Sequence, residues 1–436
     1  MAYDYKEITF NTQINTSSLP SNSAASTTCP LNIALLSLPP ANMSDSTHNI
    51  VILGGSYSGI GVAHALLKAL PGLKASTKED YRVTMISNST HFWWSVGAPR
   101  AMLKPYPNDN MDSFIPITKG FTSYPSGLYQ LVHAEVTGIE MGNLEISYKL
   151  KDEKESLASD TKTMKYDTLV IATGSTGQSP LYALQGSHVP TLKAYEDVQT
   201  RLPAAKSVWV IGGGAAGVET AGELGEMYGK KTASPKDIHI LSGSERLLPA
   251  LRPSIGQRAQ EMLEGMGVNV EHKLRLKDSK QTADGKTEII LSDGSSRTID
   301  LLLVATGRTP ASSFLPSSIL NSEGKVIIDE YQRIPNATSA YAVGDVTTSS
   351  ADPGGIIHIQ TAAPTTAGNI IAELSGKGKG KVHKPMTTKE TQFVPVGPNG
   401  GVGAAFGWWA PSIAVKMIKS KTFMFPKAVQ TVMGTA

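Results

Sequence analysis

The feature that most constrains the fold of this 436-residue chain is a strand–glycine–helix pattern that occurs twice. The first copy begins at residue 50 and reads IVILGGSYSGIGVAHALL, and the second begins at residue 208 and reads VWVIGGGAAGVETAGELGE. In a G-x-G-x-x-G loop the first glycine makes a tight turn, the second lets the backbone approach a pyrophosphate, and the third lets the helix pack on the strand. The phosphates meet the unpaired N–H groups at the start of the helix. Each copy therefore predicts a dinucleotide cradle.

The first cradle departs from this pattern at one position, because a serine stands where the second glycine belongs. Its residues are Gly54, Gly55, Ser56, Tyr57, Ser58 and Gly59. A helix is predicted from Ile60 to Leu70, with Pro71-Gly72 as its stop. The second cradle is complete, and its residues are Gly212, Gly214, Ala215 and Gly217.

The segments that follow each cradle are also repeated. Each cradle is followed by a second strand, then by an antiparallel segment, and then by a strand that ends in an ATG turn. These segments are 82–87, 144–152 and 167–174 in the first unit, and 237–242, 286–295 and 300–307 in the second. Two units in this order indicate that one was inserted into the other. We therefore expect an α/β fold with two Rossmann-like dinucleotide-binding domains and a small C-terminal α+β domain.

The acidic residue that usually binds an adenosine ribose is missing from both units. Ser87 ends the second strand of the first unit and Ser242 that of the second, and we expect each hydroxyl to bond a ribose hydroxyl more weakly than a carboxylate would. Glu245 would favour the free hydroxyl of NADH, and Arg246 would favour the phosphate of NADPH. The sequence leaves the choice between the two nucleotides open.

Composition narrows the class of protein. A net charge of +3 gives no reason to expect a nucleic-acid partner, and no apolar run reaches the roughly 20 residues of a membrane helix. The single cysteine, Cys29, excludes an internal disulfide. Residues 1–46 are rich in Ser, Thr, Asn and Pro and lack the pattern of a secretory signal or a mitochondrial presequence. We expect a disordered tail there, or a native start at Met43.

Several further segments together resemble a known family. These are SNSTHFWWSVGAPRA from residue 87, the two ATG turns, AYAVGDV from residue 340, PVGPNGGVGAAFGWW from residue 395 and KSKTFMFPK from residue 419. With the two cradles, they resemble the pyridine-nucleotide-dependent flavoprotein oxidoreductases. The likeness is greatest to the apoptosis-inducing-factor-like group of the AMID and ferroptosis-suppressor type, especially its fungal members, and it spans residues 47–436.

This resemblance implies FAD in the first cradle and NADH or NADPH in the second, with no resident metal. The implied boundaries are an FAD-binding domain at 47–190 and 309–376, an inserted NAD(P)H-binding domain at 191–308 and a C-terminal domain at 377–436. The residues that it adds to the glycines and serines of the cofactor sites are Arg100, Val136, Ala172, Thr173, Gly174, Gly307, Gly344 and Asp345.

The resemblance also assigns individual roles. Asp345 would accept a hydrogen bond from the flavin ribityl chain, and Arg100 would lie near FAD, facing either a phosphate or a neighbouring carboxylate. Glu219 would point at the nicotinamide, although a carboxylate in the first turn of a helix is also favoured by the helix dipole. A helix predicted at 356–374, despite Pro364, would direct its N-terminus at the flavin.

Within that helix Gln360 is a candidate catalytic residue, and His358 is better explained as a structural hydrogen-bonding group. Trp93 and Trp94 are better explained as core residues than as walls of the flavin site.

The lack of a second cysteine limits the route by which electrons can leave the flavin. Without a cysteine pair, electrons must leave to a diffusible acceptor; the resemblance implies a quinone, and dioxygen is the alternative. Two other functions on the same scaffold are a tailoring oxidoreductase of secondary metabolism and a redox or cell-death signalling protein.

The C-terminal stretch 406–429 combines aromatic residues with lysines. It is typical either of a peripheral contact with a lipid surface or of a small domain that packs its aromatic residues inward. We expect a cytoplasmic protein, with any membrane association peripheral, and leave its oligomeric state open.

Overall fold

The structure, a computed structural model, describes residues 47–104, 113–348, 356–377 and 380–435. These ranges lie within one compact unit, Pro40–Ala436. The expected N-terminal tail, Met43 as a native start and Cys29 fall outside the described residues.

The first sheet has seven strands in the order β18-β8-β1-β2-β5-β6-β7. Its parallel strands are β1 (Thr47–Leu53), β2 (Asp80–Ser87), β5 (Tyr129–Glu140), β8 (Thr168–Ile171) and β18 (Ala340–Ala342). In sequence order this is the 3-2-1-4-5 arrangement of a doubly wound fold. The antiparallel strands β6 (Glu145–Leu150) and β7 (Lys162–Lys165) extend one edge.

The second sheet repeats this arrangement with one strand fewer. Its order is β12-β11-β10-β16, and all four strands are parallel. Their bounds are β10 (Ser207–Ile211), β11 (Asp237–Ser242), β12 (Val268–His272) and β16 (Leu301–Val304). An antiparallel meander of β13 (Leu276–Gln281), β14 (Thr287–Leu291) and β15 (Ser296–Ile299) covers part of it, packing Ile289, Leu291 and Ile299 against Trp209 and Ile211. The predicted repeat and fold class are confirmed.

The chain passes between the two sheets along a short two-stranded ribbon. Strand β9 (Ser175–Gly177) leaves the ATG turn of the first sheet, and β17 (Arg308–Pro310) leaves that of the second and pairs with β9 in antiparallel fashion. The second sheet is thus formed entirely by residues between β8 and β18 of the first, which is the topology expected for an insertion.

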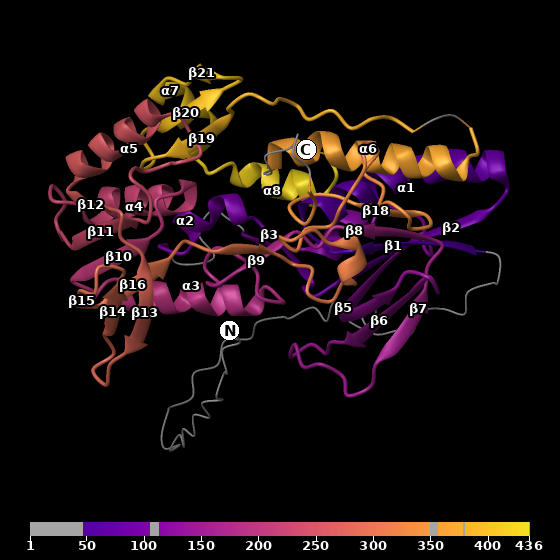
Figure 1. Cartoon of the computed structure of the whole chain (residues 1–436), viewed down its shortest axis with the longest axis horizontal. Helices are drawn as coiled ribbons and strands as arrows, with labels where there is room; N and C mark the ends of the chain where they lie inside the picture. Colours follow the sequence, from indigo (N-terminus) through magenta and orange to yellow (C-terminus); the bar gives the residue numbers. More distant parts are fainter. Residues whose placement is uncertain (1–46, 105–112, 349–355, 378–379, 436) are drawn as a thin grey trace, which may run out of the picture. The chain divides into compact units, whose positions relative to one another are not determined.

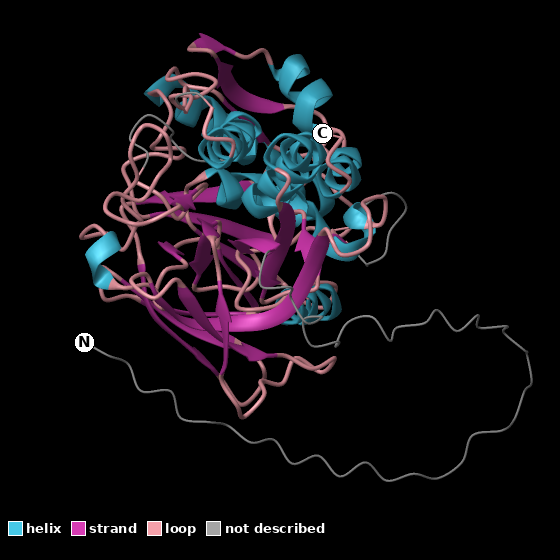
Figure 2. Cartoon of the chain, turned by 90° about the vertical axis from the view of Figure 1, so that its right-hand side faces the viewer, coloured by secondary structure: helices cyan, strands magenta, loops and turns pink. Residues whose placement is uncertain are grey.

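Helix α1 (Tyr57–Thr77) packs beside α6 (Ile356–Leu374), as Figure 1 shows, and Figure 2 shows helices layered above the strands. The bounds of α6 agree with the prediction, but the predicted stop of α1 at Pro71-Gly72 is wrong. Proline inside a helix costs about 3 kcal/mol. Leu66, Leu70 and Leu73 on either side of it are fully or almost fully buried, and their packing outweighs that cost.

The remaining helices begin or flank the second unit. They are α2 (Ala98–Ala101), α3 (Val189–Arg201), α4 (Ala215–Tyr228) and α5 (Pro253–Met266). Within the described ranges, no helix combines the length and apolar character needed to cross a membrane.

The C-terminal residues form a small sheet and three helical segments. The sheet order is β19-β20-β21, with β19 at Gln392–Pro395, β20 at Gly401–Ala405 and β21 at Trp408–Trp409. Helix α7 (Ser412–Val415), a π-helical turn (Lys416–Ser420) and α8 (Phe425–Val432) follow. This segment contacts both units, because β19 packs on α4 while α8 packs on α1.

Candidate functional site

The two cradles share a backbone geometry that only glycine permits. A side chain at Gly59 would place its Cβ closer than 3.0 Å to the carbonyl oxygen of Gly54, and a side chain at Gly217 would do the same against Gly212. Gly54 and Gly212 both have strongly positive φ, +113° and +130°, a conformation that L side chains rarely adopt. The first and third glycines of both loops therefore have the roles that the motif predicts.

Each cradle also lies against its own ATG turn. A Cβ on Gly54 would meet the carbonyl oxygen of Ala172, and one on Gly212 would lie 2.7 Å from that of Ala305. This contact places the turns 172–174 and 305–307 directly beside the loops that were predicted to hold phosphate.

The loops leave room for an anionic ligand at the helix N-termini. Gly214 is the N-cap of α4, and a Cβ added there would meet no atom within 4 Å. Ser56 is the N-cap of α1 in extended conformation, and its hydroxyl makes no capping hydrogen bond. Because neither helix start is capped by a side chain, both fit a pyrophosphate group.

The two strand-end serines do not point outward as a ribose contact would require. Ser87 Oγ donates to the Ser89 carbonyl at 2.7 Å and accepts from the Ser89 N–H at 3.2 Å. Ser242 Oγ donates to the Arg246 carbonyl at 3.0 Å and accepts from the Ser244 N–H at 3.2 Å. Both serines are buried, so their hydroxyls shape the following turn. The expectation that they bind ribose is therefore not supported.

The two residues expected to select the nucleotide differ in exposure, because Glu245 is exposed and Arg246 is partly buried. The Arg246 guanidinium donates to the Pro249 and Leu251 carbonyls and so holds its own loop. Glu245 is 81% exposed and lies 3.1 Å from Lys273 Nζ. The carboxylate is thus better placed to meet a ribose than the guanidinium is to meet a phosphate.

The Gly344-Asp345 turn lies at the first cradle. A Cβ on Gly344 would collide with Ser58 Oγ, so the turn lies against the Ser58 side chain at the start of α1. Asp345 Oδ2 is 3.6 Å from Arg308 Nη1 and accepts a hydrogen bond of 3.4 Å from Ser175 Oγ. The predicted flavin-binding carboxylate therefore sits where the β9–β17 ribbon meets the first cradle.

The buried Arg100 side chain makes its hydrogen bonds to other residues of the protein. Its Nε and Nη2 donate to both carboxylate oxygens of Glu223 at 2.7 Å, and the guanidinium also donates to the Ser420 and Lys421 carbonyls and lies 4.5 Å from the Phe423 ring. Arg100 and Glu223 are 4% and 2% exposed. Of the two partners left open by the sequence, the neighbouring carboxylate is the correct one, and the assignment of Arg100 to the cofactor is not supported.

A second buried ion pair lies one helical turn earlier on α4. Glu219 is 5% exposed at its side chain, and its Oε1 accepts from Lys419 Nζ at 2.5 Å. Burial raises the pKa of Glu219, while the Lys419 charge opposes that rise. Lys419 comes from the π-helical turn, so the C-terminal segment completes this part of the site.

Buried tyrosines connect the two cradles. Tyr182 OH bonds Thr220 Oγ1 at 2.9 Å, and burial together with the Glu219 charge raises the pKa of its phenol. Burial also raises the pKa of Tyr195, with further contributions from neighbouring Tyr182 and Tyr57. Tyr182 thus contacts the helix of the second cradle, and Tyr57, which begins the helix of the first, packs against the same buried cluster as Tyr182 and Tyr195.

The other predicted residues are placed individually. Trp93 and Trp94 are core residues, as expected, and their Nε1 atoms donate to Tyr195 OH at 3.2 Å and the Phe423 carbonyl at 2.9 Å. His358 is buried, and Gln360 is exposed in the first turns of α6. Val136 is half-buried on β5. The structure brings neither Gln360 nor Val136 into hydrogen-bond contact with Glu219, and their proposed roles stay predictions.

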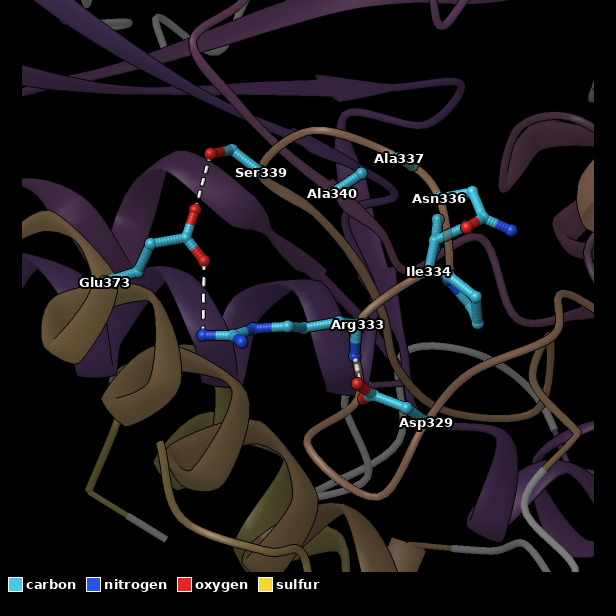
Figure 3. A pocket seen from close by; sticks show the side chains of 9 residues that line it. Asp329, Arg333, Ile334, Asn336, Ala337, Ser339, Ala340 and Glu373 are labelled. Carbon is cyan, nitrogen blue, oxygen red and sulfur yellow. Dashed lines mark hydrogen bonds and ion pairs between the residues drawn. The ribbon is translucent and has the colours of Figure 1, made fainter. Parts of the chain in front are cut away.

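A pocket of about 270 Å³ lies away from the cradles, at the N-terminal end of β18 (Figure 3). Its charged groups pair with one another: Glu373 accepts from Ser339 at 2.5 Å and lies 3.3 Å from Arg333 Nη2, and the Arg333 N–H donates to Asp329 at 2.8 Å. Parallel strands present ligands at their carboxyl ends, so this pocket is not part of the cofactor site.

The comparisons with known proteins agree with this geometry. Residues 48–366 match the model of the family described as pyridine nucleotide-disulphide oxidoreductase. The chain belongs to this family. Its relatives place it in the apoptosis-inducing-factor-like group: it is 33% identical to oxidoreductase ptaL of Pestalotiopsis fici over 87% of this chain and 98% of that protein. It is 26% identical to ferroptosis suppressor protein 1 of Xenopus tropicalis over 87% of this chain and 94% of that protein.

A solved structure extends the agreement of the fold to most of the chain. The sulfide:quinone oxidoreductase of Aquifex aeolicus has a TM-score of 0.62 at 15% identity, covering 89% of this chain and 92% of that one. This likeness shows a shared fold, and the family match over residues 48–366 makes the chain an oxidoreductase of the pyridine nucleotide-disulphide family.

Several site residues were not assigned by the sequence. Glu223, Tyr182, Arg308 and Lys419 carry no local motif, and their partners lie far away along the chain. The KSKTF segment that contains Lys419 was noted in the family resemblance, and this was the signal that pointed toward it.

Proposed function

We propose that this chain is an FAD-dependent NAD(P)H oxidoreductase that reduces a quinone-like acceptor. The proposed FAD-binding domain comprises 47–190 and 309–376, the NAD(P)H-binding domain comprises 191–308, and residues 377–436 form the C-terminal domain. When bound, the flavin would take a hydride from the nicotinamide and pass two electrons to the quinone, which also takes up two protons.

The observation that carries the proposal is the buried Glu219–Lys419 pair immediately after the second cradle. A carboxylate here would lie near the nicotinamide of a nucleotide whose pyrophosphate binds the α4 N-terminus, and Lys419 holds this carboxylate in one orientation. Because burial raises the pKa of Glu219, its carboxyl would hold a proton at a higher pH than an exposed glutamate does. Such a pair can orient the donor ring and supply a proton as the acceptor is reduced.

The name of one similar protein supports the acceptor class, because the sulfide:quinone oxidoreductase of Aquifex aeolicus shares the fold. A tailoring oxidoreductase of secondary metabolism is the second candidate, because oxidoreductase ptaL and oxidoreductase phnG of Penicillium herquei, at 33% and 32% identity, have names that specify no quinone.

The test is anaerobic titration of the purified yellow protein with NADH and with NADPH, followed by turnover with a water-soluble quinone. We expect rapid bleaching of the flavin and sustained quinone reduction. Glu219→Gln should retain flavin but slow its reduction by about 10- to 100-fold. The matched control is Glu226→Gln, an exposed carboxylate of the same helix, which should behave as wild type.

Three outcomes would contradict the proposal in different ways. Protein that stays colourless after incubation with free flavin removes the cofactor assignment. Bleaching without quinone turnover, but with turnover of another organic substrate, favours the tailoring function. Bleaching without turnover of any small acceptor favours a signalling role.

A further inference from the structure

The C-terminal sheet and the helix after it expose large apolar side chains. Trp408 and Met417 are each 78% exposed and Ile413 is 64% exposed. With Phe406, Trp409 and Ile418, which are also exposed, we call these residues the C-terminal face. The other three tryptophans of the chain, Trp93, Trp94 and Trp209, are all buried. The exposure of the final pair is therefore specific to this face.

The elements of the C-terminal face are joined to one another. β21 carries Trp408 and Trp409 and pairs with β20, while α7 packs against β20 and continues directly into the π-helical turn. Ile413 and Met417 are four residues apart in this helical segment, so they lie on the same side of it. The exposed apolar side chains are thus carried by adjoining elements, and Trp408 and Trp409, as neighbours in a strand, point to opposite sides of β21.

The sequence stretch that carries this face has charged side chains of one sign only. No Asp or Glu occurs from Thr391 to Ala436, whereas Lys416, Lys419, Lys421 and Lys427 lie in that stretch. Lys419 is held by Glu219. Among the residues that the structure describes, Lys416, Lys421 and Lys427 form no ion pair, and Lys421 and Lys427 are exposed.

We propose that the C-terminal face docks on an anionic lipid bilayer. Tryptophans favour the membrane–water interface, and Ile and Met side chains gain free energy when they enter the acyl boundary. Each lysine near an anionic surface adds about 1 kcal/mol of attraction, which is a roughly fivefold change in partitioning. A second copy of the chain fits this face less well, because a two-fold contact would bring the same lysines of both copies together, and the stretch 391–436 that carries them contains no carboxylate side chain.

The consequence of docking for quinone reduction rests on the proposed function. Lys419 directly follows the exposed Ile418 in sequence, yet its ammonium reaches the buried Glu219 beside the second cradle. The face that would touch the bilayer is therefore next to the Glu219–Lys419 pair, which the proposed function places at the site of electron transfer. A quinone dissolved in the bilayer could approach the site from this side, without first crossing water.

The binding experiment uses the full chain and vesicles of phosphatidylcholine, with or without phosphatidylserine. We expect co-sedimentation with the anionic vesicles and a blue shift of the fluorescence of Trp408 and Trp409. The variant W408S/I413Q/M417Q should lower partitioning at least tenfold. The variant K421Q/K427Q should lower partitioning on anionic vesicles and leave it unchanged on neutral ones. Ile290→Gln, at a 40% exposed apolar residue of β14, is the matched control and should bind as wild type.

The outcomes separate the alternatives. Equal binding of wild type and the triple variant would overturn the proposal. Light scattering that shows a dimer of wild type but a monomer of the triple variant, without vesicle binding by either, would assign the face to a second copy instead. Absence of both vesicle binding and dimers would also refute the bilayer contact.

Turnover distinguishes this inference from the proposed function. With a short-chain, water-soluble quinone the triple variant should equal wild type, whereas with a long-chain quinone embedded in anionic vesicles it should fall at least tenfold. If wild type turned over neither quinone, the proposed function would be refuted. If wild type and the triple variant turned over the embedded quinone at the same rate, only the docking would be refuted.

Discussion

The two cradles have nearly the same backbone but different surroundings. In both, the third glycine lies against the carbonyl of the first, and the first lies against the ATG turn. The first cradle has Ser56 at its second glycine position and is joined by the Gly344-Asp345 turn after β18. The second has the open Gly214 and no counterpart of β18 in its sheet.

The two units thus share the backbone of the glycine loop and differ in what surrounds it. The first unit has a fifth parallel strand with a carboxylate just beyond its end, and the second has the Glu219–Lys419 pair. These surroundings fit the proposed cofactors. The flexible ribityl chain of FAD needs an additional hydrogen-bonding partner, whereas a reacting nicotinamide ring needs a side chain that fixes its orientation. The comparison makes three predictions about the two units.

The largest effect is expected from filling the third glycine position. Gly217→Val should abolish reduction of the flavin by NAD(P)H, lowering the rate by at least about 100-fold, because the new side chain would drive α4 away from β10. Flavin content, read from the absorbance of the purified protein, should be preserved. Gly59→Val meets the same obstruction in the first cradle and should instead yield protein without flavin. Loss of flavin from Gly217→Val, or retention of flavin by Gly59→Val, would contradict the assignment of the two loops to separate cofactors.

A smaller effect is expected at the anchor that only the first cradle has. Asp345→Ala should weaken FAD binding by about tenfold, since a charged hydrogen bond contributes roughly 1.5 to 3 kcal/mol. Dialysis followed by flavin titration measures this change. Asp345→Asn keeps a hydrogen-bond acceptor without the charge, so its FAD affinity should lie between that of wild type and that of the alanine variant. Unchanged flavin affinity in the alanine variant would remove Asp345 from the cofactor site.

The smallest effect concerns acid stability and should be confined to the first unit. Burial, with the neighbouring His91, lowers the pKa of His188 to about 4 from its usual 6.5, and Ser89 Oγ bonds its Nδ1 at 3.1 Å just beyond β2. Below pH 6.5 the unfolded chain takes up a proton that the folded chain refuses until about pH 4. Stability is therefore fully present above pH 6.5 and is lost as the pH falls toward 4.

For this half-buried ring we expect a loss of about 1 kcal/mol over that window. Denaturant unfolding at several pH values should show a flatter profile for His188→Gln than for wild type. The exposed neighbour Val189→Gln should leave the profile unchanged. If flavin is released on acidification only as the whole chain unfolds, the two units do not differ in acid sensitivity.

Sequence reasoning was most accurate where a signal is local. Strand β11 and helix α6 have the predicted bounds, because a run of apolar residues or a helical period is contained within the segment itself. Helix α1 was predicted too short, because a proline is a local signal and the burial of Leu70 and Leu73 is not.

The site was less predictable because its contacts join distant residues. The Arg100–Glu223 pair spans 123 positions and the Glu219–Lys419 pair spans 200. No spacing rule connects such residues, so the sequence left the partner of Arg100 undecided and treated Lys419 as one lysine among several. The serines were misjudged for a related reason: whether a hydroxyl faces a ligand or its own turn depends on the path of the loop.

The contacts of the C-terminal segment have a consequence for cleaved forms of the protein. Arg100 donates to the Ser420 and Lys421 carbonyls, and Glu219 accepts from Lys419. A chain cut before residue 419 would keep both sheets but would leave the Glu219 carboxylate buried without its ammonium partner. Proteolytic loss of this segment would therefore destabilise α4, although it removes no residue of either sheet.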